Sequence, residues 1–333
     1  MNTVMDIKKY ILLASAVFVL LCAASCKKDS TESYSYLTGA PEFTLPMFAT
    51  AGETFTFTAK DVTADDGSKV GYCWYTTILS IRDTIDTFTL TLPDTLCTIS
   101  LTCAAFADGY YNSTTTQSVT IVRAGRENGS ITGLTAAEGR DFFFTDPRDG
   151  HSYLCATVGA KDWFRENLAY KGSGTALENC ETVSDVFGRF YTWDEAISAC
   201  PDGWRLSTLD DWADAASAVL GSRPDPSVRF QSAAGYFMGD LRFNGEKMWE
   251  YWPDVKITDK LGLSMIPLGY ASKMANRVDF DSMYEYAAFW TANEKDAEQA
   301  FYRYFFDESP DLFIGYSSKK SFAANVRCVR DHE

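Results

Sequence analysis

Residues 191–221, YTWDEAISACPDGWRLSTLDDWADAASAVLG, decide the predicted fold of the C-terminal half of the chain. Thr192 and Glu195 have the spacing of a capping box, which starts a short helix. Thr208 is the N-cap of a second helix, and Gly221 takes the position that ends it. The apolar residues of this second helix recur at helical spacing and are Leu209, Trp212, Ala213, Ala216, Val219 and Leu220. Two short helices before a long aromatic, Gly-rich region predict an α+β fold with long loops.

Six motif blocks, two of them inside this stretch, follow one another along the C-terminal half. They are Asp146–Gly150 (DPRDG), Trp163–Leu168 (WFRENL), Tyr191–Ala196 (YTWDEA), Cys200–Thr208 (CPDGWRLST), Trp290–Ala292 (WTA) and Val326–Val329 (VRCV). In this order they resemble the Fibrobacter succinogenes major paralogous domain, whose members run through D-P-R-D-G, W-x-x-E-N-L, Y-T-W-x-x-A, C-P-x-G-W-R-L-P-T, W-T-S and V-R-C-V. The departures are small, since Ser207 replaces the usual Pro and Ala292 the usual Ser.

The resemblance implies a C-type-lectin-like head domain of the α+β class over residues 142–331. It also implies that the fold brings the blocks of Cys200 and Cys328 together as a disulfide, the alternative being that Cys200 is a buried thiol. Such a bridge closes a loop of about 130 residues, and the chain-entropy model gives it a stabilisation of about 4–5 kcal/mol.

The first 25 residues have the features of a secretory signal. Lys8 and Lys9 precede an apolar run from Ile11 to Ala24, which is shorter than the ~20 residues of a membrane span. Small residues and then Cys26 end the run and resemble a bacterial lipobox, in which the cysteine is acylated. We therefore expect lipidation at Cys26, a tether over residues 26–40, and a surface-exposed position in the outer membrane. The alternatives are an ordinary signal peptide and a short membrane anchor.

Residues 41–124 alternate polar and apolar side chains, as in Thr54–Thr58 and Phe88–Leu92. Short alternating strands with turns between them predict an all-β sandwich that resembles Ig-like or PKD-like modules. We expect it to act as a stalk rather than as the ligand binder. A Gly-rich linker over residues 125–141 separates it from the head.

Seven cysteines follow Cys26, an odd number that leaves at least one of them unpaired or bonded to another molecule. Cys73 and Cys103 either bridge two strands or remain buried thiols. A bridge between Cys155 and Cys180 is equally open. No C-x-x-C motif is present, so the sequence gives no support to a zinc ribbon or a thioredoxin-type site.

The charge balance excludes several functions. The chain has 45 Asp and Glu against 30 Lys and Arg, a net charge of −15, which argues against a nucleic-acid partner.

Only two histidines are present, and neither lies near a Ser or Cys nucleophile motif, so no catalytic residue is predicted. No cofactor and no metal site are predicted, although abundant carboxylates leave an unassigned calcium ion possible.

The sharpest ligand-binding candidate is an aromatic segment with acidic neighbours. Trp249, Tyr251 and Trp252 offer flat apolar rings, and Asp279 and Asp281 offer carboxylates, a combination that suits sugars and protein interfaces. The alternative is that these rings are core residues.

These features predict a lipid-anchored, non-enzymatic envelope protein that binds a glycan or a surface protein through its head, in adhesion or capture. A polysaccharide-active enzyme on the same head is the first alternative. A structural or assembly component of a surface appendage is the second.

Overall fold

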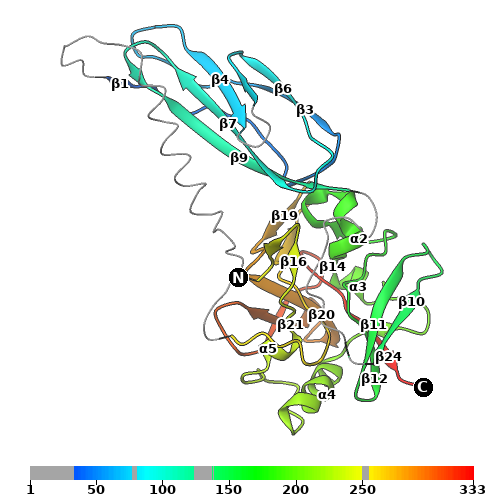
Figure 1. The fold of residues 1–333 in the computed structure, drawn as a ribbon. Helices are drawn as coiled ribbons and strands as arrows, with labels where there is room; N and C mark the ends of the chain where they lie inside the picture. The colour runs from blue at the N-terminus through cyan, green and yellow to red at the C-terminus, as the bar shows by residue number, and fades with distance from the viewer. Residues whose placement is uncertain (1–33, 77–80, 124–136, 138, 250–254) are drawn as a thin grey trace, which may run out of the picture.

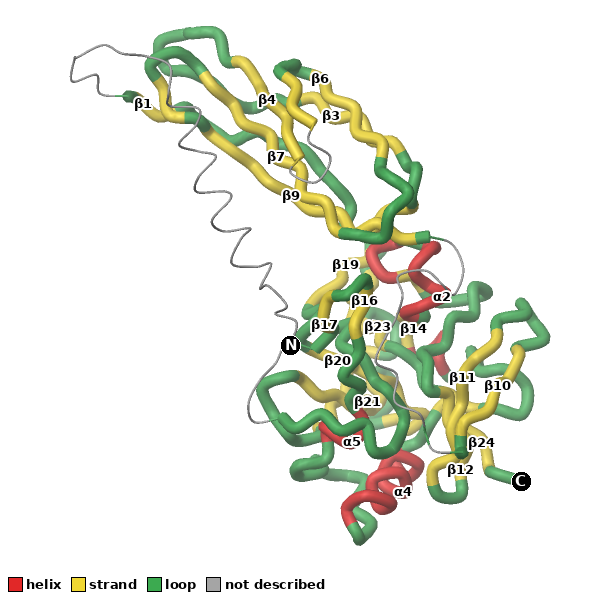
Figure 2. Tube along the Cα trace, in the orientation of Figure 1, coloured by secondary structure: helices red, strands yellow, loops and turns green. Residues whose placement is uncertain are grey.

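The computed structural model describes residues 34–76, 81–123, 137, 139–249 and 255–333, arranged as two lobes (Figure 1). The N-terminal lobe contains the strands between residues 34 and 123, and the C-terminal lobe contains the elements between residues 139 and 333. Strands hold 42% of the described residues and helices 11%, so this part of the protein is mostly β (Figure 2). No helix among the described residues is long and apolar enough to cross a membrane.

The predicted fold class, an α+β C-type-lectin-like head with an all-β Ig-like sandwich, is therefore wrong. The C-terminal lobe is built of several small sheets that curl as a half-barrel. Both capping boxes do start helices, but α3 (Trp193–Ala196) has only four residues and α4 (Leu209–Leu220) has 12. The aromatic region after α4 forms strands instead, because aromatic and β-branched side chains favour a pleated, half-buried surface.

The N-terminal lobe has one five-stranded sheet, in the order β2-β9-β7-β4-β5, and a two-stranded β3-β6 ribbon. Trp74 joins the two, because its fully buried ring stacks on Phe57 and Phe88 of the ribbon at 5.8 and 5.6 Å. The strands are β1 (Ser35–Tyr36), β2 (Phe48–Thr50), β3 (Thr54–Thr58), β4 (Gly71–Thr76), β5 (Ile81–Asp83), β6 (Thr87–Thr91), β7 (Thr98–Phe106), β8 (Tyr110–Tyr111) and β9 (Ser113–Val122).

The C-terminal lobe contains two five-stranded sheets, β10-β11-β12-β24-β15 and β13-β14-β23-β18-β19, a three-stranded sheet, β20-β21-β22, and the β16-β17 ribbon. Its strands are β10 (Asp141–Thr145), β11 (Ser152–Val158), β12 (Lys161–Phe164), β13 (Thr175–Ala176), β14 (Arg189–Thr192), β15 (Arg205–Leu206), β16 (Arg242–Phe243), β17 (Glu246–Lys247), β18 (Tyr270–Lys273), β19 (Val278–Asp281), β20 (Tyr286–Glu294), β21 (Gln299–Phe306), β22 (Phe313–Ser318), β23 (Phe322–Ala324) and β24 (Cys328–Asp331). Besides α3 and α4 its helices are η1 (Leu177–Asn179), η2 (Glu181–Val183), α2 (Ser184–Phe187) and α5 (Ala234–Phe237).

The predicted helix ends are confirmed. The Thr208 side chain accepts a hydrogen bond from the backbone of Asp211, whose carboxylate accepts one from the Thr208 backbone. Gly221 ends α4 in the left-handed conformation, at φ 79°. A second capping box joins Thr192 and Glu195 at the start of α3.

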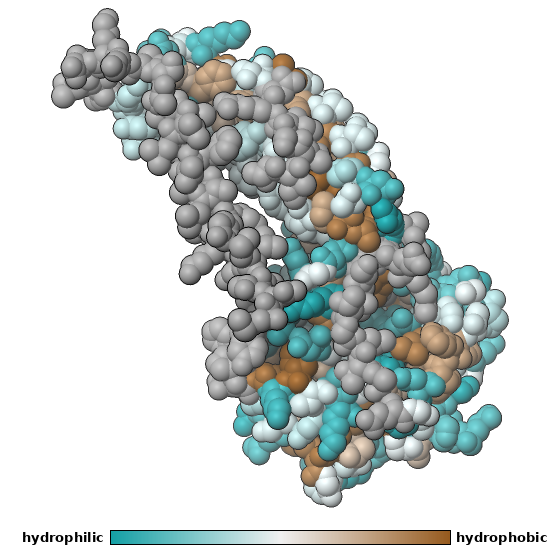
Figure 3. Space-filling view, viewed as in Figure 1, coloured by the Kyte–Doolittle hydropathy of each residue, from teal (hydrophilic) through white to brown (hydrophobic). Residues whose placement is uncertain are grey.

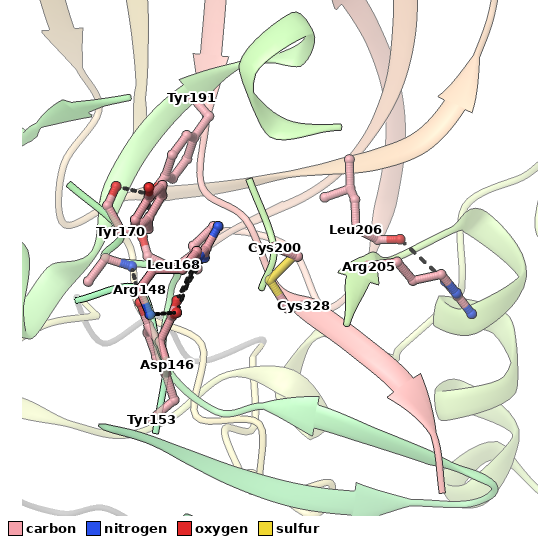
Figure 4. The surroundings of a disulfide bond; sticks show 11 residues. Asp146, Arg148, Tyr153, Leu168, Tyr170, Tyr191, Cys200, Arg205, Leu206 and Cys328 are labelled. Carbon is pink, nitrogen blue, oxygen red and sulfur yellow. Dashed lines mark hydrogen bonds and ion pairs between the residues drawn. A yellow bond between two sulfur atoms is a disulfide. The ribbon is translucent and has the colours of Figure 1, made fainter. Parts of the chain in front are cut away.

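The disulfide between Cys200 and Cys328 is also confirmed, with Cα atoms 5.8 Å apart (Figure 4). It ties the segment after α3 to β24, the strand that lies between β12 and β15. Beside it, Arg148 pairs with the fully buried Asp146 at 2.7 Å and its guanidinium lies 3.7 Å above the ring of Tyr170. The D-P-R-D-G block therefore stabilises a turn within the lobe.

The two lobes share a buried apolar cluster. Phe48 of β2 and Val122 of β9 belong to the same cluster as Phe187 and Phe243 of the C-terminal lobe. The Phe48 ring meets the rings of Phe187 and Phe243 edge-on, with centroids 5.9 and 6.3 Å away. Because burial of apolar surface is the main stabilising force, this contact holds the lobes in one arrangement.

Arginines of two motif blocks form a buried polar network. Arg327 is 1% exposed; it donates to Asn167 Oδ1 at 2.8 Å and to the carbonyls of Phe164 and Leu263. Arg165 donates to Asp141 at 2.8 Å and lies 3.9 Å from Asp259. These bonds join the WFRENL and VRCV blocks, and they explain why both blocks carry a charged residue inside the core.

Asp259 should make stability depend on pH. Its carboxylate is 2% exposed and accepts bonds from the Ser264 backbone and hydroxyl at 2.8 and 2.6 Å, yet burial raises its pKa to about 6. Folding thus favours the protonated acid, a stabilisation that is complete below pH ~4 and lost as pH rises through ~6. Unfolding titrations at pH 4 and 7 should show wild type losing about 2 kcal/mol relative to Asp259→Asn. A difference that stays constant or reverses with pH would contradict this.

Candidate functional site

Trp249, the centre of the predicted binding segment, is a core residue. Its side chain is fully buried and its indole N–H donates to the carbonyl of Met265 at 3.0 Å. The ring packs on Phe305 with centroids 5.7 Å apart. The prediction of a ligand surface at Trp249 is therefore wrong. Burial of this large apolar ring in the core is more favourable than its exposure to water. Tyr251 and Trp252 lie outside the described residues.

The two predicted aspartates lie on β19, away from the Trp249 core. Asp279 is exposed and pairs with Arg277 at 3.1 Å. Asp281 lines a cavity of about 360 Å³ at the junction of the lobes, together with Met47, Glu178 and Tyr284. Among the described residues no group of three or more His, Cys, Asp or Glu side chains is placed to hold a metal ion.

The remaining predicted cysteines are free thiols. Cys73 and Cys103 lie on neighbouring strands, but Cys73 is opposite Ala104 and Cys103 is opposite Trp74, so their side chains point to opposite faces of the sheet. Cys155 and Cys180 belong to different clusters of the C-terminal lobe. Neither of the two possible bridges forms, and Cys26 lies outside the described residues.

A row of aromatic residues covers one face of the β20-β21-β22 sheet. Antiparallel pairing sets Tyr286 opposite Phe306, Tyr304 opposite Phe313, and Tyr302 opposite Gly315. Alternate residues of these strands, such as Phe289 and Phe305, point the other way into the core. Two rings of neighbouring strands extend the row. We define the aromatic face as Tyr270, Tyr286, Tyr302, Tyr304, Phe306, Phe313 and Phe322, all partly exposed. Four of these rings also pack on the buried cluster of Trp290, which lies opposite Tyr302 on the same face.

The rings of this face touch one another in an unbroken series. Across the three strands, Tyr286, Tyr304 and Phe313 stack with successive centroids 5.2 Å apart. Tyr302 joins the row through Tyr304 at 5.5 Å and through Phe322 at 4.9 Å. Each contact is within the range of favourable aromatic pairs, so the rings hold one another in place before any ligand arrives.

Gly315 shapes the centre of the face. A Cβ atom at this position would lie 2.6 Å from the ring of Tyr302, well inside van der Waals contact. The absent side chain therefore lets the Tyr302 ring lie over the backbone of β22. One face of the Tyr302 ring contacts Gly315 of β22, and the side chain stays partly exposed to solvent.

The aromatic face is neutral and can form hydrogen bonds. Burial raises the pKa of Tyr302 and of Tyr304, and it raises that of Tyr286 further, so all three phenols keep their protons at physiological pH. The positions opposite Tyr302, Tyr304 and Phe306 carry no charged side chain, whereas Glu294, opposite Ala300 at the end of the face, pairs with Lys319 at 2.6 Å.

Sequence reasoning missed this face for a physical reason. The alternation over residues 300–306 is hidden, because both sides of β21 carry aromatic rings, with Phe301 and Phe305 facing away from Tyr302 and Tyr304. The signal that could have found it is the small residue Gly315 opposite a tyrosine.

Elsewhere on the surface, hydrophobic residues form separate patches among hydrophilic ones on the side of the molecule seen in Figure 3.

A search of curated proteins found no match to this chain. A comparison with family models matched residues 157–330 to the Fibrobacter succinogenes major domain. The matched region is more than half of the 333 residues and includes β12, α4 and the aromatic face. The chain belongs to the Fibrobacter succinogenes major domain family.

Proposed function

We propose that this protein binds a neutral glycan at the cell envelope through the aromatic face. The observation that carries the proposal is the unbroken row of partly exposed rings on β20, β21 and β22. Flat rings cover the apolar C–H faces of sugar rings, and the phenol hydroxyls bond to sugar hydroxyls.

The charge distribution supports a neutral ligand over a charged one. The ring-bearing positions of the paired strands hold no cation for an acidic sugar or a phosphate, Lys319 is already paired with Glu294 at the end of the face, and the chain carries a net charge of −15. A polyanion would therefore meet repulsion without compensation. A ligand that offers hydroxyls and C–H groups, such as a neutral polysaccharide, meets matching groups at the tyrosines.

A glycan array probed with residues 26–333, which include every described residue, tests the proposal. We expect binding to neutral oligosaccharides, with the bound sugar recovered intact. Release of shortened sugars would instead favour a polysaccharide-active enzyme. No sugar binding, with capture of an envelope protein, would favour an assembly component.

We also propose that Cys26 is acylated and holds the protein in the outer membrane, with residues 41–124 as a stalk and the C-terminal lobe exposed at the surface. The order of charged residues, apolar run and lipobox-like cysteine supports this. Cys26→Ala should release the protein from membranes in a flotation assay, whereas unchanged retention would refute acylation.

A further inference from the structure

A cluster of exposed tyrosines lies at one end of the N-terminal lobe. Tyr34, Tyr36 and Tyr111 are 47%, 76% and 51% exposed, which places them among the most exposed large side chains of the described residues. We call these three residues the tyrosine tip. In Figure 1 β1, which contains Tyr36 and pairs with the β8 strand of Tyr111, lies at the end of the N-terminal lobe farthest from β20 and β21.

The tyrosine tip is formed by two segments that lie far apart in the sequence, residues 34–36 and β8. β1 pairs in parallel with β8, and Tyr36 lies opposite Tyr111, so both rings emerge on one face. Tyr34 is two residues before Tyr36 and shares that face. The ring of Tyr111 lies 5.3 Å from that of Tyr34 and 5.0 Å from that of Tyr36. Ring contacts thus hold together side chains that have little other packing.

We propose that the tyrosine tip rests on the lipid headgroup surface and seats the N-terminal lobe on the membrane. This inference depends on the acylation of Cys26 proposed above. Tyr34 follows Cys26 by eight residues, a segment that spans roughly 29 Å at most when fully extended. The tip is therefore the part of the described structure that an acylated Cys26 holds nearest the bilayer.

The chemistry of the tip suits this position. Tyrosine has an apolar ring and a polar hydroxyl, and it is enriched at the boundary between hydrocarbon and water for that reason. The short tether leaves little space for a large partner between the tip and the bilayer, which favours lipid over a protein. β20 and β21, which carry much of the aromatic face, lie in the other lobe and at a distance from β1 (Figure 1).

The neighbouring charges predict which lipid surface the tip meets. Asp65 accepts a hydrogen bond from Thr38 at 3.0 Å, and the backbone of Asp66 donates to the hydroxyl of Tyr110, so carboxylates lie close to this end. Anionic headgroups would repel them. The tip should therefore meet zwitterionic phospholipid, and the contact should persist in high salt.

Hydroxyl-radical footprinting of the acylated full chain on phosphatidylcholine vesicles tests whether the tyrosine tip contacts the lipid headgroups. We expect Tyr34, Tyr36 and Tyr111 to be oxidised roughly fivefold more slowly on vesicles than in the unacylated Cys26→Ser protein in solution, because lipid covers them. Tyr316 of β22 is 52% exposed and serves as the matched control, with an unchanged rate.

The outcomes separate the two proposals. A chain that fails to float with vesicles overturns the acylation and the seat together. A chain that floats but shows equal oxidation of the tip in both states overturns the seat alone. Protection that is found only in native envelopes, and not on pure vesicles, assigns the tip to a protein partner and also overturns the lipid contact.

Discussion

Replacing both Cys200 and Cys328 with alanine should lower the free energy of unfolding of the C-terminal lobe by about 5 kcal/mol. The bridge closes a loop with a sequence separation of 128 residues, and without it the unfolded chain gains the entropy of that loop. For a lobe of this size the change corresponds to a fall in melting temperature of roughly 10–20 °C. Calorimetry of wild type and the double variant measures it.

The control is Cys97→Ala, which removes a free, partly exposed thiol of the N-terminal lobe and should change little. Dithiothreitol should destabilise wild type about as much as the double substitution does, and it should leave the double variant unchanged. Equal melting temperatures for wild type and the double variant would contradict the stabilising role of the bridge.

Phe48→Ala should have the second largest effect and should loosen the two lobes. Phe48 is 3% exposed and packs edge-on against the contacting pair of rings Phe187 and Phe243. Truncating a buried phenylalanine costs about 3–5 kcal/mol, and here the lost contacts are those between the lobes. We expect the lobes to unfold in separate transitions in calorimetry, and the junction to become open to proteases.

A matched substitution in the same lobe is Phe106→Ala, because Phe106 is 37% exposed. Its effect should be about 1 kcal/mol, well below that of Phe48→Ala, because the ring covers Gly71 at the surface. If the two variants unfold alike, the Phe48 contact does not couple the lobes.

Local signals in the sequence were reliable where backbone chemistry sets the outcome. The capping residues Thr192 and Thr208 and the stop at Gly221 lie where predicted, because each satisfies or frees backbone groups within a few residues. The strand over Thr54–Thr58 was predicted for a similar reason, since its threonines face solvent and its phenylalanines face the core.

The fold class and the site were not predictable in the same way, because they depend on tertiary contacts. A capping box marks where a helix begins but not how long it is. The helix α3 has only four residues, and the elements before and after it, β14 and β15, are strands. Trp249 and Tyr302 both lie in aromatic-rich segments of the sequence, Met248–Trp249 and Phe301–Phe306. Only the register of β21 and β22 places Tyr302 over Gly315 at the surface, while Trp249 is buried.

The affinity of an array-identified neutral glycan for the double variant Tyr302→Ala/Tyr304→Ala tests the central claim most directly. Aromatic stacking contributes about 1–3 kcal/mol per ring, so the loss of two rings should reduce the affinity measured by calorimetric titration by roughly 30-fold or more. Tyr316→Ala, an exposed tyrosine on the opposite face of the same sheet, should bind like wild type. If the folded double variant binds the glycan as tightly as wild type, the aromatic face is not the binding site.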